Sequence, residues 1–213
     1  MKYLKLIVLV GVLTMPMFGC AFGTDYVKIF KYSPKGSGSS GSGAEVYVVK
    51  AEDNRSQPEY LGQKAGGYVA IEKGLDLSKI MTDSVVSTLE SEGYSVKYTD
   101  NPGLVVTAGG QKIKYLNTSI DELWTTFVQG FWTVDANARA KVTFELKESG
   151  TDRVLWKKVI GKGDTESAMS APPGLFQDAL NAAMTKVMED FQSNASSGDF
   201  KNALMQGSVV EVK

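Results

Sequence analysis

Histidine is missing from this chain of 213 residues, and cysteine occurs once, at position 20. Without histidine the chain cannot build Ser-His-Asp or Cys-His nucleophile systems, or any metal site based on imidazole. A single cysteine cannot form an intramolecular disulfide, so a folded domain must be stabilised by packing. The lack of histidine therefore excludes the commonest nucleophilic hydrolase sites and the metal sites that use imidazole ligands.

Long apolar runs are scarce, and the clearest one lies near the start of the chain. Lys2 and Lys5 precede the nearly uninterrupted apolar stretch 6–15. A permanent membrane helix needs about 20 apolar residues, so this shorter run is typical of a secretory signal peptide. No later run is long enough to span a membrane, and we expect the mature chain to be a soluble domain on a tether.

Cys20 follows this run and has three alternative interpretations. Cleavage after Ala21 would discard it, and a buried structural thiol is a second alternative. In the third, the phrase Met17-Phe18-Gly19-Cys20 resembles a bacterial lipoprotein cleavage site, whose cysteine becomes the new N-terminus. We favour the third: residues 1–19 form a lipoprotein signal peptide, and Cys20 carries diacylglycerol and an N-acyl lipid such as palmitate. Ala21 in place of aspartate resembles enterobacterial sorting to the outer membrane, facing the periplasm.

Charge is nearly balanced, with 23 basic and 24 acidic residues. Loss of residues 1–19 would remove two lysines and take the formal net charge from −1 to −3. This balance gives no electrostatic footprint for nucleic acid, so we expect no nucleic-acid partner. Residues 20–213 are enough for one periplasmic domain with a sizeable core.

A Gly/Ser stretch, residues 36–43, interrupts the pattern early in this domain. It is either a flexible linker after the anchor or a long loop between two strands of one sheet. We favour the loop, because the strand predicted at 26–32 would otherwise have nothing to pack against. That strand would place Val27 and Ile29 on one face and Tyr32 on the other.

Alternation and β-branched residues predict further strands. Their ranges are 45–51, 94–100, 104–107, 112–116, 138–146 and 154–160. The clearest alternation is in 138–146, and the turn after it makes an antiparallel hairpin with 154–160. Residues 45–99 form a strand-helix-strand unit of the kind that pairs in parallel.

Two helices are expected. Asp76 is a plausible N-cap for a helix with an apolar stripe, and Gly93 ends it. Pro172 and Pro173 open the second, whose apolar stripe ends at Phe191. A short helix and tail fill 198–213. The order predicts an α+β two-layer sandwich, with a mixed, mostly antiparallel sheet covered on one face by two helices.

Several phrases then carry a family resemblance. They are the turn AEDNR at 51–55, L-x-x-x-G-Y-x-V at 89–96, A-x-A-x-V at 138–142, and the helical phrases 178–192 and 200–206. Their shared order resembles the YajG family of small bacterial outer-membrane lipoproteins over nearly the whole mature chain. The resemblance implies that location and fold, and it implies no reaction, since members of the family are largely uncharacterised. The Gly/Ser loop and an aromatic segment depart from the pattern.

Carboxylate-only catalysis is the remaining enzymatic alternative. Glu52 with Asp53, or Asp164 with Glu166, could be the two carboxylates of a site that cleaves cell-wall glycan. The alternative is that all four lie in polar turns at strand ends, where such side chains are solvated. The glycine-rich stretch 62–67 lacks the G-K-[ST] ending of a phosphate loop, so we expect a flexible connector. We predict no enzyme, no cofactor and no metal.

The aromatic segment LWTTFVQGFW, 123–132, carries the candidate partner-binding residues Trp124, Phe127, Phe131 and Trp132. These rings either fill the core and cap the sheet, or form an exposed patch for a partner protein, a lipid or a hydrophobic metabolite. Arg55 and Arg139 are candidates for bonding an acidic partner, or else solvated strand-edge charges.

Two functions follow. The first is a lipid-anchored module that docks an unidentified protein of the envelope without catalysis. The second is a carrier or accessory subunit that holds a lipid or wall fragment, and it requires an apolar cavity of several hundred Å³.

Overall fold

The computed structural model describes residues 23–36, 38, 40–100, 112–151, 153–169 and 172–206. The predicted signal peptide, Cys20, the strand expected at 104–107 and the end of the C-terminal tail lie outside these residues. None of the described helices is long and apolar enough to cross a membrane.

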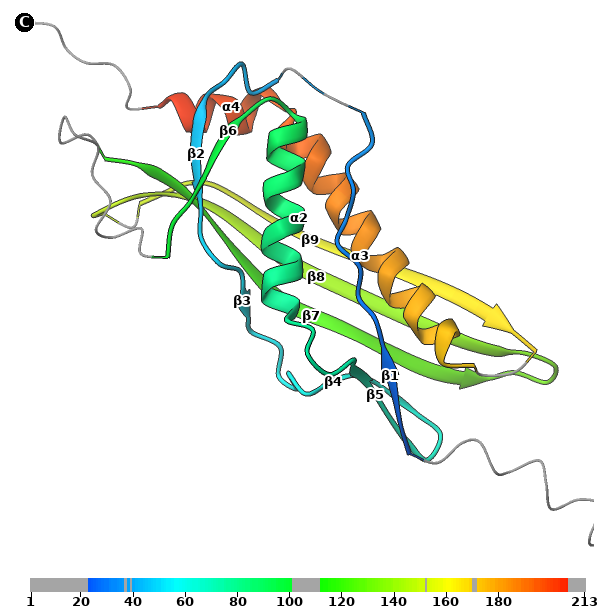
Figure 1. Cartoon of the computed structure of the whole chain (residues 1–213). Coiled ribbons are helices and arrows are strands. Elements are labelled where there is room, and N and C mark those ends of the chain that lie inside the picture. Colours follow the sequence, from blue (N-terminus) through cyan, green and yellow to red (C-terminus); the bar gives the residue numbers. More distant parts are fainter. Residues whose placement is uncertain are drawn as a thin grey trace, which may run out of the picture.

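A mixed sheet forms one layer, and its longest strands make an antiparallel meander (Figure 1). These are β7 (Lys114–Gln129), β8 (Val134–Glu148) and β9 (Arg153–Ala168). On its other edge β7 pairs in turn with three short parallel strands, β2 (Glu45–Val48), β3 (Glu52–Asp53) and β4 (Tyr60–Lys64). Beyond them lie β6 (Ser95–Tyr98), β5 (Gly67–Ile71) and β1 (Gly23–Val27). The strand predicted at 112–116 is therefore the beginning of a much longer one.

Alternation in β8 sets the two faces of the sheet. The predicted inward set is fully buried, and its members are Ala138, Ala140, Val142, Phe144 and Leu146. The hairpin with β9 pairs antiparallel over nearly its whole length. Because alternate residues point to opposite faces, the other set on β8 faces away from the core.

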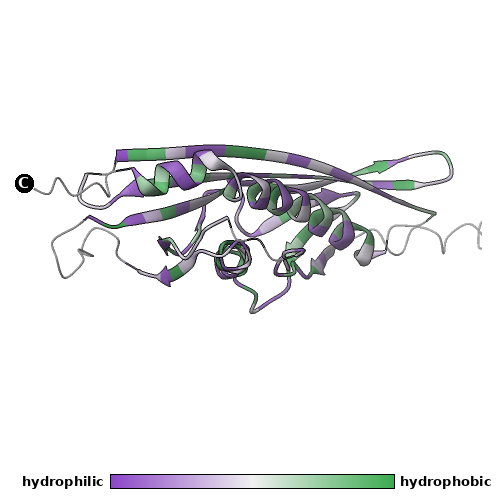
Figure 2. Ribbon diagram, turned by 90° about the horizontal axis from the view of Figure 1, so that it is seen from above, coloured by the Kyte–Doolittle hydropathy of each residue, from purple (hydrophilic) through white to green (hydrophobic). Residues whose placement is uncertain are grey.

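Three described helices lie on one face of this sheet: α2 (Leu77–Ser91), α3 (Pro173–Ala195) and α4 (Gly198–Met205). Figure 2, viewed from above, shows them on one side of the long strands. The Asp76 side chain accepts from the Lys79 N–H (3.1 Å), and Gly93 has a positive φ of 83° after α2. The predicted α+β two-layer fold, both helices and the parallel pairing of β2 with β6 are confirmed.

The N-terminal strand is shorter than expected. It ends at Val27, and the next five residues run between α2 and α3 instead of continuing in the sheet (Figure 1). There the backbone N–H of Lys28 donates to Gln177 Oε1 (2.9 Å) and that of Phe30 donates to Asn181 Oδ1 (2.8 Å). Side-chain amides of α3 thus take the place of a neighbouring strand. The segment after Val27 is therefore no longer a strand, and its side chains no longer alternate between two faces.

Tyr32 shows this break most clearly, because it is buried although the alternation placed it opposite Val27 and Ile29, which are also buried. Its N–H donates to Ser84 Oγ in α2 (3.0 Å), and its hydroxyl donates to Gln192 Oε1 in α3 (2.9 Å). Burial raises the pKa of the Tyr32 phenol. One residue therefore connects both helices.

The described part of the Gly/Ser stretch packs against the end of α2. The N–H groups of Gly38, Gly41 and Gly43 donate to the carbonyls of Ser91, Glu92 and Gly93 at 2.7–2.8 Å. A Cβ on Gly41 would lie 2.6 Å from the Tyr94 backbone nitrogen, so only glycine fits this close approach.

The stretch 62–67 is not the flexible connector that we predicted. It contains the end of β4, a two-residue turn and the start of β5, which pair antiparallel. Lys64, with only 7 % of its side chain exposed, forms an ion pair with Asp25 in β1 (2.7 Å). This pair links β4 to β1 across the strand between them, β5.

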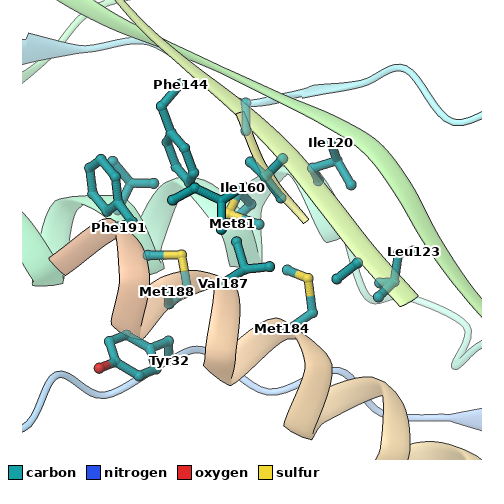
Figure 3. Packing of buried hydrophobic residues seen from close by; sticks show 14 of the residues in the cluster. Tyr32, Met81, Ile120, Leu123, Phe144, Ile160, Met184, Val187, Met188 and Phe191 are labelled. Atoms are coloured by element: carbon teal, nitrogen blue, oxygen red, sulfur yellow. The ribbon is translucent and has the colours of Figure 1, made fainter. Parts of the chain in front are cut away.

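Aromatic and aliphatic side chains fill the space between the sheet and the helices (Figure 3). Phe144 of β8 stacks on Phe191 of α3, with ring centroids 4.2 Å apart. Phe200 of α4 makes edge contacts with Tyr94 and Trp156, at 5.5 and 5.0 Å. The Tyr94 hydroxyl donates to the Ala195 carbonyl (2.7 Å), and burial raises its pKa to about 12.

We expect Asn181→Ala to lower the free energy of unfolding by about 1–2 kcal/mol, because it breaks the bonds to Phe30 N–H and the Lys28 carbonyl. Asn194→Ala is the matched control, since the Asn194 side chain bonds only within α3, to the Asp190 carbonyl (2.7 Å), among the described residues. Urea unfolding measures both. Equal stabilities would show that the N-terminal segment is not held by this amide.

Candidate interaction surface

The face of the sheet opposite the helices carries the outward side chains of β7, β8 and β9, and we call this the open face. Strand register places Trp124 opposite Arg139 and Glu122 opposite Lys141. The next strand, β9, places Gly163 opposite Arg139 and Gly161 opposite Lys141. Glycines have no side chain, so both basic groups stand beside uncovered backbone.

Arg139 and Lys141 are exposed, and neither forms an ion pair or side-chain hydrogen bond with any residue that the structure describes. Trp124 is half-buried and lies on the neighbouring strand β7, directly opposite Arg139. The open face therefore presents an aromatic ring beside two available cations.

Two hollows lie along these strands, one lined by Trp124 and the other by Arg139. The smaller, about 300 Å³, is lined by Arg55, Ser56, Gln57, Asp121, Glu122, Leu123, Trp124 and Lys141. The larger, about 680 Å³, is lined by Thr126, Val128, Asn137, Ala138, Arg139, Gly163, Asp164 and Thr165. Their walls mix polar and apolar groups, which suits contact with a protein surface more than enclosure of an apolar ligand.

Two acidic groups of the open face, Glu145 and Asp121, are held by their neighbours. Glu145 pairs with Lys147 (2.8 Å) and Lys157 (2.7 Å), and these two hydrogen-bonded ammonium groups lower the pKa of its carboxyl. Asp121 accepts from Ser119 Oγ (2.7 Å) and Thr143 Oγ1 (2.5 Å). Arg139, Lys141 and Glu122 are the charged groups near Trp124 that have neither an ion pair nor a side-chain hydrogen bond with a described residue.

Arg55 lines the smaller hollow but is not the solvated charge that we considered. It is buried, and its guanidinium donates twice to the Asp53 carboxylate (2.8 Å each) and also to the carbonyls of Tyr60 and Pro58 (2.9 and 2.8 Å). All these bonds lie between Asp53 and Tyr60, so the Arg55 guanidinium fixes the connection between β3 and β4 and is already paired with a carboxylate.

The predicted aromatic residues do not form one patch. Phe127 faces the helices and packs against the core, and Trp124 lies on the open face. Phe131 and Trp132 lie at the β7–β8 turn, where they are 88 % and 77 % exposed and their rings meet edge to face at 4.7 Å. Val128, near the end of β7, and Met169, directly after β9, are exposed at the same end of the sheet, and we call these four residues the hairpin tip.

Sequence reasoning missed Met169, Lys141 and the two glycines of β9. Strand register alone brings them to these positions, and no local motif marks them.

Two of the four carboxylates considered for catalysis are in ion pairs, Asp53 with Arg55 and Asp164 with Lys186 (3.1 Å). The described residues contain no cluster of acidic side chains that could hold a metal ion.

No family model matches the chain, and no curated protein matches its sequence. Its fold is similar to that of protein XCC0632 from Xanthomonas campestris, of the family DUF330, with a TM-score of 0.54, 13% identity, and coverage of 87% of this chain and 97% of that one. A Helicobacter pylori protein, named as a homologue of a neuraminyllactose-binding hemagglutinin, matches with a TM-score of 0.51, 12% identity and coverage of 81% and 96%.

The lipoprotein GNA1162 from Neisseria meningitidis also aligns, with a TM-score of 0.36, 13% identity and coverage of 68% of this chain and 97% of that one. That score is too low to carry an argument. At these identities the first two neighbours show a shared fold and nothing of ligand or partner.

Glu145 gives a prediction for pH dependence. Its pKa is lower in the folded chain than in the unfolded chain, so its ion pairs stabilise the fold above the unfolded value, about pH 4.3, and this contribution disappears as the pH falls further. We expect Glu145→Gln to be less stable than the wild type near neutral pH, and the difference to shrink between about pH 5 and pH 3.

Urea unfolding at several pH values measures this difference. Glu122→Gln is the control, because Glu122 lies on the same face without an ion pair to any described residue. A difference between wild type and Glu145→Gln that stays constant with pH would contradict the assignment.

Proposed function

We propose that this chain is a non-enzymatic, lipid-anchored module of the bacterial cell envelope that binds a partner protein through the open face. The observation that carries the proposal is the group of Trp124, Arg139 and Lys141 on the helix-free side of the sheet. Tryptophan and arginine dominate the energetics of protein interfaces, and arginine binds carboxylates through two parallel hydrogen bonds. The partner would therefore present an acidic side chain to Arg139.

The anchor in this proposal is the lipid on Cys20, with diacylglycerol and an N-acyl chain, and the location is the outer membrane facing the periplasm. The sequence supports it through the signal-peptide pattern and the resemblance to YajG-type lipoproteins. The described fold begins at Gly23, three residues after Cys20, so such an anchor would leave a very short tether.

A carrier function receives less support. It needs an apolar cavity between sheet and helices, and this space holds the stacked rings of Phe144 and Phe191 and the edge contacts around Phe200. The hollows lined by Trp124 and by Arg139 are open and partly polar. We therefore propose that the partner binds on the open face of the sheet and not in a cavity between the sheet and the helices.

Site-specific photocrosslinking in intact cells tests the partner. A photoreactive amino acid at Thr126, which is exposed beside Arg139, should give a specific adduct that mass spectrometry identifies. The same group at Asp178, exposed on α3, should not give it. Arg139→Glu should abolish the adduct because it repels an acidic partner, whereas Lys73→Glu, a charge reversal away from the open face, should leave it unchanged.

The proposal would be wrong if the Thr126 adduct survives Arg139→Glu, or if positions 126 and 178 give the same products. Expression and solubility of each variant are compared first, so that loss of folding is not mistaken for loss of binding.

Lipid attachment has its own test. Cells grown with a fatty-acid probe should label the wild-type protein, and Cys20→Ser should remain unlabelled because the thiol that accepts the lipid is gone. Detection by gel fluorescence and membrane fractionation gives the result. A wild-type protein without label would remove the anchor from the proposal.

A further inference from the structure

The hairpin tip is a compact, uncharged group at the end of the longest strands. Residues 129–134 carry no ionisable side chain, and Phe131, Trp132 and Met169 are each at least 77 % exposed. Monomeric proteins rarely expose a contiguous group of large apolar side chains that has no binding role. The pairing of β7 with β8 continues to Gln129 and Val134, so the tip is rigidly supported.

Strand register fixes the position of the tip relative to the start of the fold. Gly23 in β1 pairs with Gly67, Gly67 pairs with Lys64, and the neighbouring Gln63 pairs with Thr126 of β7. Gly23 is therefore nearly level with Phe127, about four residues or 13 Å from Phe131 along the strand direction. Across the sheet the two strands are three spacings, or about 14 Å, apart.

The direction of β1 points to the same end. It runs antiparallel to β7 through these pairings, so β1 begins at the end of the sheet where β7 finishes. Figure 1 shows the start of β1 and the β7–β8 turn at one end of the molecule, and α4 at the other. Three residues span at most about 10 Å, so a lipid attached at Cys20 is held within about that distance of Gly23.

We propose that the hairpin tip inserts into the interfacial region of the phospholipid bilayer that holds the lipid of Cys20. This inference rests on the anchor in the proposed function. Tryptophan and phenylalanine favour the boundary between head groups and acyl chains, where the indole ring is apolar and its N–H can still bond to water. Lipid and tip then make two separated contacts, which hold the long strands in one orientation and leave the open face accessible from the side.

Tryptophan fluorescence of the full, lipidated protein in phosphatidylethanolamine–phosphatidylglycerol vesicles tests this. Trp124→Phe with Trp156→Phe leaves Trp132 as the single tryptophan, since the chain has three. We expect its emission to shift to the blue and to fall about twofold when the vesicles contain a phosphatidylcholine brominated near the head of its acyl chains. The matched control keeps Trp124 alone on the open face and should show neither effect.

If the double substitution impairs folding, the wild type is compared with Trp132→Ser, and bromolipid quenching should be present in the first and lost in the second. Equal quenching in both, or a Trp132 that stays fully accessible to acrylamide on vesicles, overturns the insertion. Mass spectrometry of the N-terminal peptide separates the two proposals. A lipidated Cys20 with unquenched Trp132 refutes insertion alone, and a Cys20 without lipid refutes the anchor and the insertion together.

Discussion

Strand β7 has to satisfy the hydrogen-bonding groups of both its edges, because it lies in the middle of the sheet. One edge is satisfied by a single partner, β8, along its whole length. The other is shared by β2, β3 and β4, each for a few residues. This division explains the asymmetry of the molecule: one side is a long regular hairpin, and the other consists of short strands whose connections supply helix α2 and the β4–β5 hairpin.

Much of the fold could be predicted because the relevant signals are local. The alternation in β8, the caps of α2 and the apolar stripe of α3 all belong to segments whose neighbours in sequence determine their exposure. The N-terminal strand was predicted too long for the opposite reason. Its end depends on Gln177 and Asn181, which lie about 150 residues away and bind its backbone through side-chain amides. No pattern within 26–32 contains that information.

The candidate surface depends on one irregularity in β7. A register shift between Ile120 and Glu122 inserts an extra residue, Asp121, into the strand. Without it, strict alternation from buried Ile120 would point Trp124 into the core. With it, Trp124 faces outward and Phe127 inward. The sequence could therefore indicate an aromatic segment and its place near a strand, while the sorting of the rings between core and surface required the bulge, which no residue type in 119–122 marks.

The parallel pairing of β1 with β5 also has a mechanical meaning. Five residue pairs join these strands, and the ion pair between Asp25 and Lys64 ties β1 to β4 beyond them. A pull on the chain at Gly23 along the strand direction loads these bonds side by side, because they lie across the direction of force. They must yield together, unlike the bonds of a hairpin that is opened from its free end one pair at a time. The first strand of the fold is thus built to resist tension on the segment that precedes it.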